Sequence, residues 1–295
     1  ENVRPILLFA AGLGSAAHAR LTEEYPTSLN RILTTNPFKL YLDTNLVTFD
    51  QAVFLFRRCQ QKDRSTLASA ALLKVLQDEA RSGSLYCERR LAVHRARAIS
   101  TLPLDLVEAA CRTMLSQQDI IEFTVDSIPR LTLGRHAREE QRIADLVARR
   151  RSTIIPPLTA SDAEIIAALA RAGCTTPDPS QIAAVRTAIS NPTSLVTGGP
   201  GSGKTSILSA IASLTLDAND QANVVCISLA ARIARAINAR TGLAADTIHK
   251  FLDWRDGVFT HDASNPFEAD LVFLEEAFMI DNMLFHALLE ALPQT

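Results

Sequence analysis

The chain has 295 residues, of which 47% are hydrophobic and 21% are charged, and its formal net charge is −2. This length suffices for about two domains with cores of their own, and the composition excludes a globally disordered protein. This net charge by itself says little about partners, and a nucleic-acid binder would have to concentrate its arginines locally.

The five cysteines are widely spaced and include no C-x-x-C pair. We interpret them as reduced, packed thiols of a cytoplasmic protein. The apolar run at 6–11 is far too short to span a bilayer, and no cleavable signal is evident.

Up to about Arg151 the pattern predicts mostly helical structure. Apolar residues recur at spacings of three and four, which predicts helices at 51–58, 66–80, 104–115 and 135–151. Turn signals separate them at 36–37, 82–84 and 102–103. A boundary is expected at Ile154-Ile155-Pro156-Pro157.

Beyond this boundary helices alternate with strands. Helices are predicted at 160–171, 180–189, 205–212, 231–240 and 279–292. Buried parallel strands are predicted at 195–197, 224–229 and 271–274. This alternation is typical of an α/β nucleotide-binding domain. Because such a sheet usually has about five or more strands, we expect residues 1–295 to be part of a longer protein.

The run from Gly198 to Thr205 fits the phosphate-binding pattern G-x-x-x-x-G-K-[ST] at every fixed position. Glycines let consecutive backbone N–H groups face the oxygens of a nucleoside triphosphate, and the following helix directs its positive end at them. We expect Lys204 to reach the β- and γ-phosphates and the Thr205 hydroxyl to bind Mg²⁺. The predicted nucleotide-binding residues of the loop are Gly198, Gly199, Pro200, Gly201, Ser202, Gly203, Lys204, Thr205 and Ser206.

The apolar strand at 271–274 ends in Glu275 and Glu276. Beside a phosphate loop, one carboxylate at such an edge can hold Mg²⁺ and the next can orient the attacking water. We therefore assign Glu275 to the metal, and Glu276 with Lys204 to catalysis. Many NTPases have Asp at the first position, and Glu is longer by one C–C bond, about 1.5 Å. The alternative is an ordinary solvated acidic pair.

These motifs resemble, in order and spacing, those of RecD-like superfamily 1 DNA helicases of the long, stand-alone kind, which are related to the exodeoxyribonuclease V alpha subunit. The similar segments are 197–205, 243–252 and 275–281. Gln181 matches a glutamine that contacts the adenine edge in such helicases, and His249 also matches a family position. The resemblance implies a P-loop ATPase with ATP and Mg²⁺ as ligands. It also implies movement, 5′-to-3′, on single-stranded DNA or DNA with a single-stranded end, in DNA repair or DNA recombination.

The resemblance extends toward the N-terminus. Segments 11–17, 36–40 and 48–52 are similar to helix-hairpin-helix segments that precede the motor, and 82–86 and 139–144 are similar to parts of a helical linker domain. It therefore implies a helix-hairpin-helix-like region at 1–65, a helical linker or N-terminal domain at 66–155, and a truncated first RecA-like motor domain at 156–295.

The chain departs from the family pattern in three respects. A Pro-Thr-Gly turn that contacts DNA in the family is replaced by Leu-Ala-Ala-Arg-Ile-Ala at 229–234, and Phe278 stands where serine is usual. The second motor domain, which supplies an arginine to the transition state, is absent. The fragment alone is therefore expected to bind ATP well and to hydrolyse it poorly.

Several features allow two interpretations with respect to DNA. Basic residues cluster around 57–64, 89–97 and 149–151, where they form either a path for phosphates or solvated helix faces. The turn at 12–14 is either a phosphate contact or a plain turn. Trp254, with Phe251 nearby, either stacks on a base or packs in a core.

Three functions stay open. The first is an ATP-dependent DNA helicase of the RecD-like type. The second is another P-loop ATPase, such as a clamp loader or a conjugative-transfer or recombination factor. The third is a degenerate motor that serves as a nucleotide-responsive module for binding DNA or a partner.

Overall fold

The computed structural model describes residues 4–44, 46–59, 63–153, 158–255 and 258–293. The chain forms two compact units, Glu1–Arg138 and Glu139–Thr295. The boundary expected at 154–157 lies outside the described residues, and the three-part division at 65 and 155 stays a prediction. No helix among the described residues has both the length and the apolar character that a membrane crossing requires.

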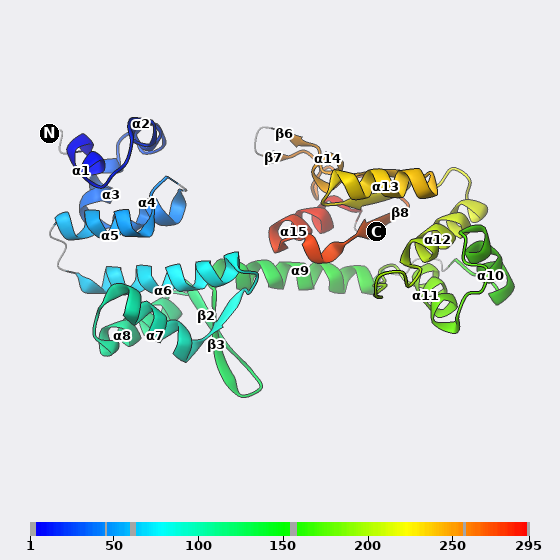
Figure 1. The fold of residues 1–295 in the computed structure, drawn as a ribbon, viewed down its shortest axis with the longest axis horizontal. Helices are drawn as coiled ribbons and strands as arrows, with labels where there is room; N and C mark the ends of the chain where they lie inside the picture. Colours follow the sequence, from blue (N-terminus) through cyan, green and yellow to red (C-terminus); the bar gives the residue numbers. More distant parts are fainter. Residues whose placement is uncertain (1–3, 45, 60–62, 154–157, 256–257, 294–295) are drawn as a thin grey trace. The chain divides into compact units, whose positions relative to one another are not determined.

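The first unit is mostly helical, as the sequence predicts (Figure 1). Its helices are α1 (Arg4–Ala10), α2 (Ser15–Glu24), α3 (Leu29–Thr35), α4 (Phe38–Asp43), α5 (Phe49–Arg58), α6 (Arg64–Arg81), α7 (Arg89–Ser100) and α8 (Leu104–Ser116). One apolar cluster, extending from Leu8 to Leu133, forms its core. Helix α5 begins two residues before the predicted start because Thr48 and Gln51 form a reciprocal capping box at its N-terminus.

The first unit also contains a small antiparallel sheet that the helical pattern did not predict. Strands β1 (Tyr86–Glu88), β2 (Ile120–Val125) and β3 (Ile128–Leu133) pair in the order β1-β3-β2. Asp126 and Ser127 connect β2 and β3, and both have positive φ, 51° and 64°, which matches the twist of a two-residue hairpin. The alternating residues on either side of this pair are the signal that the helical interpretation missed.

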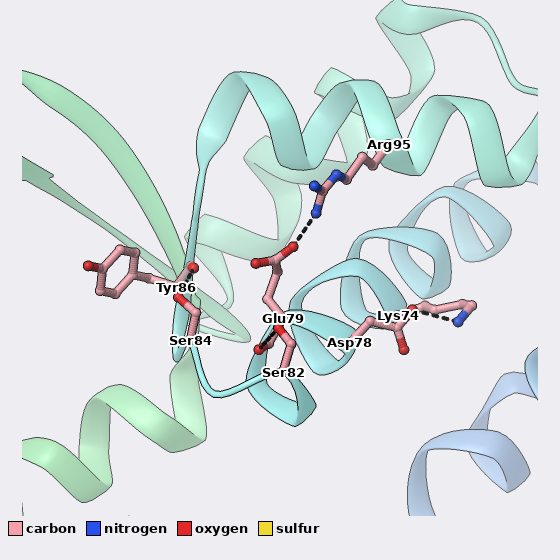
Figure 2. Close-up of polar contacts among 7 residues, drawn as sticks. All are labelled: Lys74, Asp78, Glu79, Ser82, Ser84, Tyr86 and Arg95. Carbon is pink, nitrogen blue, oxygen red and sulfur yellow. Dashed lines mark hydrogen bonds and ion pairs between the residues drawn. The ribbon is translucent and has the colours of Figure 1, made fainter.

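Polar contacts join the end of α6 to its neighbours (Figure 2). Glu79 accepts a hydrogen bond from Arg95 of α7, and Lys74 donates to Asp78 at 2.7 Å within α6. The Ser84 hydroxyl donates to the Tyr86 carbonyl at 2.8 Å, where the chain enters β1. These contacts fix the turn that leads from α6 into the sheet.

The second unit is an α/β domain whose parallel sheet has the order β5-β4-β8. Its strands are β4 (Val224–Ser228), β5 (Ala244–Thr247), β6 (Trp254–Arg255), β7 (Val258–Phe259) and β8 (Leu271–Glu275); β6 and β7 pair as a separate hairpin. Its helices are α9 (Gly134–Ser152), which begins in the first unit, α10 (Asp162–Arg171), α11 (Pro179–Ser190), α12 (Lys204–Ala218), α13 (Ala231–Thr241), α14 (Ile248–Phe251), the 3₁₀ turn η1 (Ala277–Met279) and α15 (Asn282–Ala291).

Helices cover both faces of this sheet, because the side chains of β8 alternate between them. Leu271 and Phe273 pack with the cluster built from α10, α11 and α12. Val272 and Leu274 pack with the cluster that includes α14 and α15. The predicted α/β fold is confirmed for this unit.

The strand predicted at 195–197 is wrong in this structure. Residues 194–199 have no regular secondary structure, and Leu195 is 82% exposed. Val196 packs against the α12 cluster, but a strand also needs a neighbour for its backbone hydrogen bonds, and none pairs with this segment among the described residues. β5, which was not predicted as a strand, is the third member of the sheet.

Arg150, near the end of α9, caps the C-terminus of α15 within the second unit. Its Nη2 atom donates to the carbonyl oxygens of Leu289 and Leu292, at 3.0 and 2.9 Å. Burial lowers the pKa of the Arg150 guanidinium. On the same two helices, the Glu139 carboxylate lies 2.9 Å from the His286 ring. An arginine at a helix C-terminus donates to carbonyl oxygens of the last turn, where the helix dipole favours a positive charge.

We expect Arg150→Met to lower the free energy of unfolding by about 2 kcal/mol, because hydrogen bonds made by charged groups contribute about 1.5–3 kcal/mol. Chemical denaturation measures this change. The matched control is Arg151→Met, which removes an exposed arginine of the same helix and should change the value by less than about 0.5 kcal/mol. Equal effects of the two substitutions would contradict the capping role.

Candidate functional site

The loop from Gly198 to Gly203 has a shape that requires its glycines. Gly201 and Gly203 have φ values of +75° and +84°, in the left-handed region that favours glycine. A Cβ on Gly198 would lie 2.4 Å from the Ser202 hydroxyl oxygen. The loop therefore folds back on itself, as a phosphate-binding turn must.

Lys204 is the first residue of α12, and its ammonium group lies over the loop. It donates hydrogen bonds to the carbonyl oxygens of Gly198, at 2.7 Å, and Gly199, at 2.9 Å. No side chain caps the N-terminus of α12, where Gly203 is the N-cap residue. The positive N-terminal end of α12 therefore lies at the loop, where a phosphate would bind.

Gln181 lies against the same loop, although it is 21 residues upstream of Ser202. Its side-chain amide nitrogen donates to the Ser202 carbonyl at 3.1 Å. A Cβ on Gly203 would lie 2.6 Å from that nitrogen. The structure therefore brings this predicted nucleotide-binding residue into contact with the phosphate loop.

Two partners of Gln181 were missed by sequence reasoning. Asp178 is the N-cap of α11, and its backbone N–H donates to the Gln181 side-chain oxygen at 3.0 Å within a reciprocal capping box. The Cys174 thiol donates to the same oxygen at 3.3 Å. The capping pattern from 178 to 181 was available as a signal, whereas the Cys174 contact depends on how the chain folds before α11.

The carboxylates lie at the end of β8. Glu275 pairs in register with Ser228 of β4. The pKa of the Glu275 carboxyl is raised, first by burial and then by neighbouring Glu276, while the positive charge of Lys204 opposes the shift. The positive charge of Lys204 is therefore near enough to Glu275 to favour its ionised form.

Glu276 has a strained backbone. Its φ of +53° places it in the left-handed region, which costs a residue with a side chain about 1–2 kcal/mol. It is also the N-cap of η1. Non-glycine residues in this conformation are found preferentially at functional sites, which is consistent with the catalytic role predicted for Glu276.

The oxygen atoms available at this site are ligands of the kind that Mg²⁺ prefers. Thr205, the second residue of α12, is half-buried, as is Ser206. Among the described residues no group of three or more His, Cys, Asp or Glu side chains could hold a metal alone. Mg²⁺ is usually bound by one or two carboxylates together with substrate phosphates and waters, which suits Thr205 and Glu275 beside a nucleotide. These metal roles stay predictions.

The segments expected to face DNA are only partly exposed. Trp254 is 50% exposed and its ring lies 4.6 Å from that of Phe259. Phe251 is buried and packs instead against Phe267, with ring centroids 4.1 Å apart. Exposed His249 lies on α14, with its ring 6.3 Å from Phe259.

Several arginines of the predicted basic clusters form contacts within the protein. Arg89 pairs with Glu108 and Glu122, and Arg95 pairs with Glu79. Arg95 is exposed even so, and the other exposed members of the clusters are Arg57, Arg58, Arg64, Arg90, Arg97, Arg149 and Arg151; Lys62 lies outside the described residues. In the segment 229–234, Arg232 is exposed at the start of α13.

Comparison with known proteins supports the nucleotide-binding interpretation. Residues 181–295 match a protein family described as an AAA domain. A segment of 99 residues is 30% identical to the ATP-dependent RecD2 DNA helicase of Deinococcus radiodurans. This alignment covers 34% of the chain and 14% of the length of that helicase. Together with the parallel sheet, these matches support a helicase-like P-loop protein with an α/β fold.

Glu275→Gln should stabilise the protein near neutral pH in the absence of Mg²⁺ and nucleotide. The folded state raises the pKa of the Glu275 carboxyl above its usual value of 4.5, which means that it favours the protonated form. The stability that this protonated carboxyl contributes is fully present below pH 4.5. It is lost as the pH rises through the folded-state pKa. The melting temperature of Glu275→Gln should therefore exceed that of the wild type at pH 7.5, and the difference should shrink toward pH 4.5.

The control is Glu268→Gln, which changes an exposed carboxyl of the same unit. It should leave the melting temperature at pH 7.5 nearly unchanged. A difference between Glu275→Gln and wild type that grows as the pH falls would contradict the raised pKa.

Proposed function

We propose that this chain contains the first motor domain of an ATP-dependent DNA helicase of the RecD-like type. The observation that supports this most directly is the phosphate loop, where the Lys204 ammonium group donates to the carbonyl oxygens of Gly198 and Gly199. Glu275 and Glu276, at the end of β8, supply the acidic half that a P-loop ATPase site requires.

In this proposal each group has one task. Lys204 exchanges the carbonyl oxygens of the loop for the β- and γ-phosphate oxygens of ATP and neutralises charge in the transition state. Thr205 and Glu275 would hold Mg²⁺, which would supply positive charge to neutralise the phosphates. Glu276 accepts a hydrogen bond from the attacking water and orients it in line with the γ-phosphate.

The DNA part of the proposal depends on similarity and on exposure. The matched relative is named a DNA helicase, and Trp254 presents an exposed ring beside Arg255 on the β6–β7 hairpin. We propose single-stranded DNA, or DNA with a single-stranded end, as the substrate and 5′-to-3′ movement as the activity. The helical pair α1–α2, joined at Gly12, is proposed as a helix-hairpin-helix contact to the DNA backbone.

A second candidate is a nucleotide-responsive binding module without helicase activity. It is favoured by the segment 229–234, which lacks the polar turn of the family, and by Phe278, which is 84% exposed two residues after Glu276. The two candidates differ in turnover: a helicase hydrolyses ATP faster on DNA, whereas a module binds ATP without sustained hydrolysis.

We expect the full-length protein to hydrolyse ATP and to do so faster with single-stranded DNA in a steady-state assay. Lys204→Ala should weaken ATP binding and abolish turnover. Glu276→Gln should retain binding but lower kcat by about 10²-fold or more, since general-base catalysis contributes about 10²–10⁴-fold.

The control for these variants is Glu290→Gln on α15, where the carboxylate lies 3.5 Å from the His286 ring. Tight ATP binding by wild-type protein without hydrolysis, on DNA or off it, would reject the helicase in favour of the binding module.

Trp254→Ala should weaken binding of a fluorescent oligo(dT) by about 5- to 100-fold, because stacking of an aromatic side chain on a base contributes about 1–3 kcal/mol. Fluorescence anisotropy measures this affinity. The matched control is Val258→Ala on the same hairpin, where the side chain is 66% exposed but has no ring. Equal losses of affinity in both variants would mean that the fold of the hairpin, and not stacking of the Trp254 ring, is responsible for DNA binding.

A further inference from the structure

The first unit contains a cavity of about 320 Å³. Its walls come from the first turns of α7 and α8 and from the β2–β3 hairpin. The lining residues are Glu88, Arg89, Arg90, Val93, His94, Leu104, Glu108 and Pro129. Pockets that bind small ligands have volumes from about 300 Å³ upward, so this cavity can accept one ring system with a charged group attached.

Two charged residues of the lining are neutralised within the protein. Nη2 of Arg89 lies 3.2 Å from the Glu108 carboxylate, and Nη1 lies 2.6 Å from that of Glu122 on β2. These contacts hold the guanidinium between α8 and the sheet. Arg89 and Glu108 therefore shape the cavity, and neither of them requires a charged ligand.

Three other polar side chains of the lining, those of Glu88, Arg90 and His94, are exposed. No ion pair joins any of them to another residue in the part of the chain that the structure describes. Arg90 lies in the first turn of α7, where the helix dipole disfavours a positive charge. The charge of Arg90 therefore does not stabilise α7, and its guanidinium is available to a ligand.

Arg90 and His94 form a pair of neighbouring donors. They are four residues apart on α7 and so lie on the same face of the helix, one turn from each other. A phosphate monoester carries about −1.5 to −2 charges at pH 7 and three acceptor oxygens. It suits two adjacent donors better than a phosphate within a strand, which has a single negative charge.

The rest of the lining fits a nucleobase. Val93, Leu104 and Pro129 supply apolar contacts for a flat ring, and Leu104 is 39% exposed. The ionised Glu88 carboxylate only accepts hydrogen bonds, which the amines and ring N–H groups of bases can donate. Because Glu88 would repel a simple anion such as inorganic phosphate, the ligand must combine a negative group with donors.

We propose that this cavity binds the terminal nucleotide of a single DNA strand, with the terminal phosphate on Arg90 and His94 and the base against Leu104 and Pro129. The strand continues along α7, where exposed Arg97 lies seven residues after Arg90 and thus on the same helix face. The inference rests on the proposed function only in that DNA is the partner. It adds a site in the first unit that recognises a strand end.

Fluorescence anisotropy on the full-length protein, without ATP, compares three oligo(dT) strands labelled on an internal base. One carries a phosphate at its 5′ end, one at its 3′ end, and one at neither. A phosphate at one of the two ends should raise the affinity about tenfold or more, the usual effect of a hydrogen bond between charged groups. This advantage should persist in Lys204→Ala, because the phosphate loop is not its source.

Arg90→Gln and His94→Gln, both at exposed positions, should each reduce the advantage of the phosphorylated strand to about threefold or less. The matched control is Arg97→Gln, which removes an exposed arginine of the same helix outside the cavity lining. It should weaken binding of all three strands alike and leave their ratio unchanged. A phosphorylated abasic end should bind about fourfold more weakly than a phosphorylated dT end, the effect of burying one methylene-sized apolar area.

Equal affinities of the wild type for the three strands would overturn the inference, as would an advantage that Arg90→Gln keeps or Lys204→Ala loses. Displacement of the phosphorylated strand by an equal concentration of dTMP would also overturn it, because a free nucleotide would then be the ligand. The proposed function fails by a different result, in which the full-length protein neither binds DNA nor hydrolyses ATP.

Discussion

Backbone carbonyl oxygens of the phosphate loop are the groups on which the candidate site depends. Lys204 binds those of Gly198 and Gly199, and Gln181 binds that of Ser202. The loop is thereby attached to α12, which it precedes, and to α11, which is upstream in the chain. Each such hydrogen bond contributes only about 1 kcal/mol, so the loop keeps its shape through several contacts together with its glycines.

The acidic end of β8, unlike the phosphate loop, lowers the stability of the domain. Glu275 is half-buried next to another carboxylate, and Glu276 has a left-handed backbone. Both features lower stability, and the surrounding structure tolerates them because β8 is paired with β4 and covered on both faces. Destabilising charge and strain at one point of a well-packed domain is the usual compromise of a catalytic site.

The arginines show why charge along a sequence does not identify a surface. Arg89 and Arg95 pair with carboxylates, and Arg150 caps a helix, so they are not available to a nucleic-acid backbone. The exposed arginines next to them in the sequence are available to such a backbone. Packing therefore decides which arginines of a basic segment form contacts within the protein and which face solvent. That packing depends on residues far away in the chain.

Local patterns predicted most helices of the second unit and two of the three strands of its parallel sheet, but in the first unit they predicted only α5, α6 and α8 and missed α1 to α4 and α7. The hairpin at 120–133 was missed although its signal is local, because the helical spacing around it was given more weight. The strand at 195–197 was wrong because an apolar run becomes a strand only when a neighbour accepts its hydrogen bonds. Pairing partners are not determined by the run itself.

The sequence by itself determined the phosphate loop, because its glycines and Lys204 act within eight consecutive residues. It also placed Glu275 and Glu276 at the end of a strand. Only the tertiary structure decided which amide end of Gln181 faces the loop and that Lys204 acts on Glu275. Those relations join residues that are tens of positions apart, and they arise only when α11, α12 and β8 pack together.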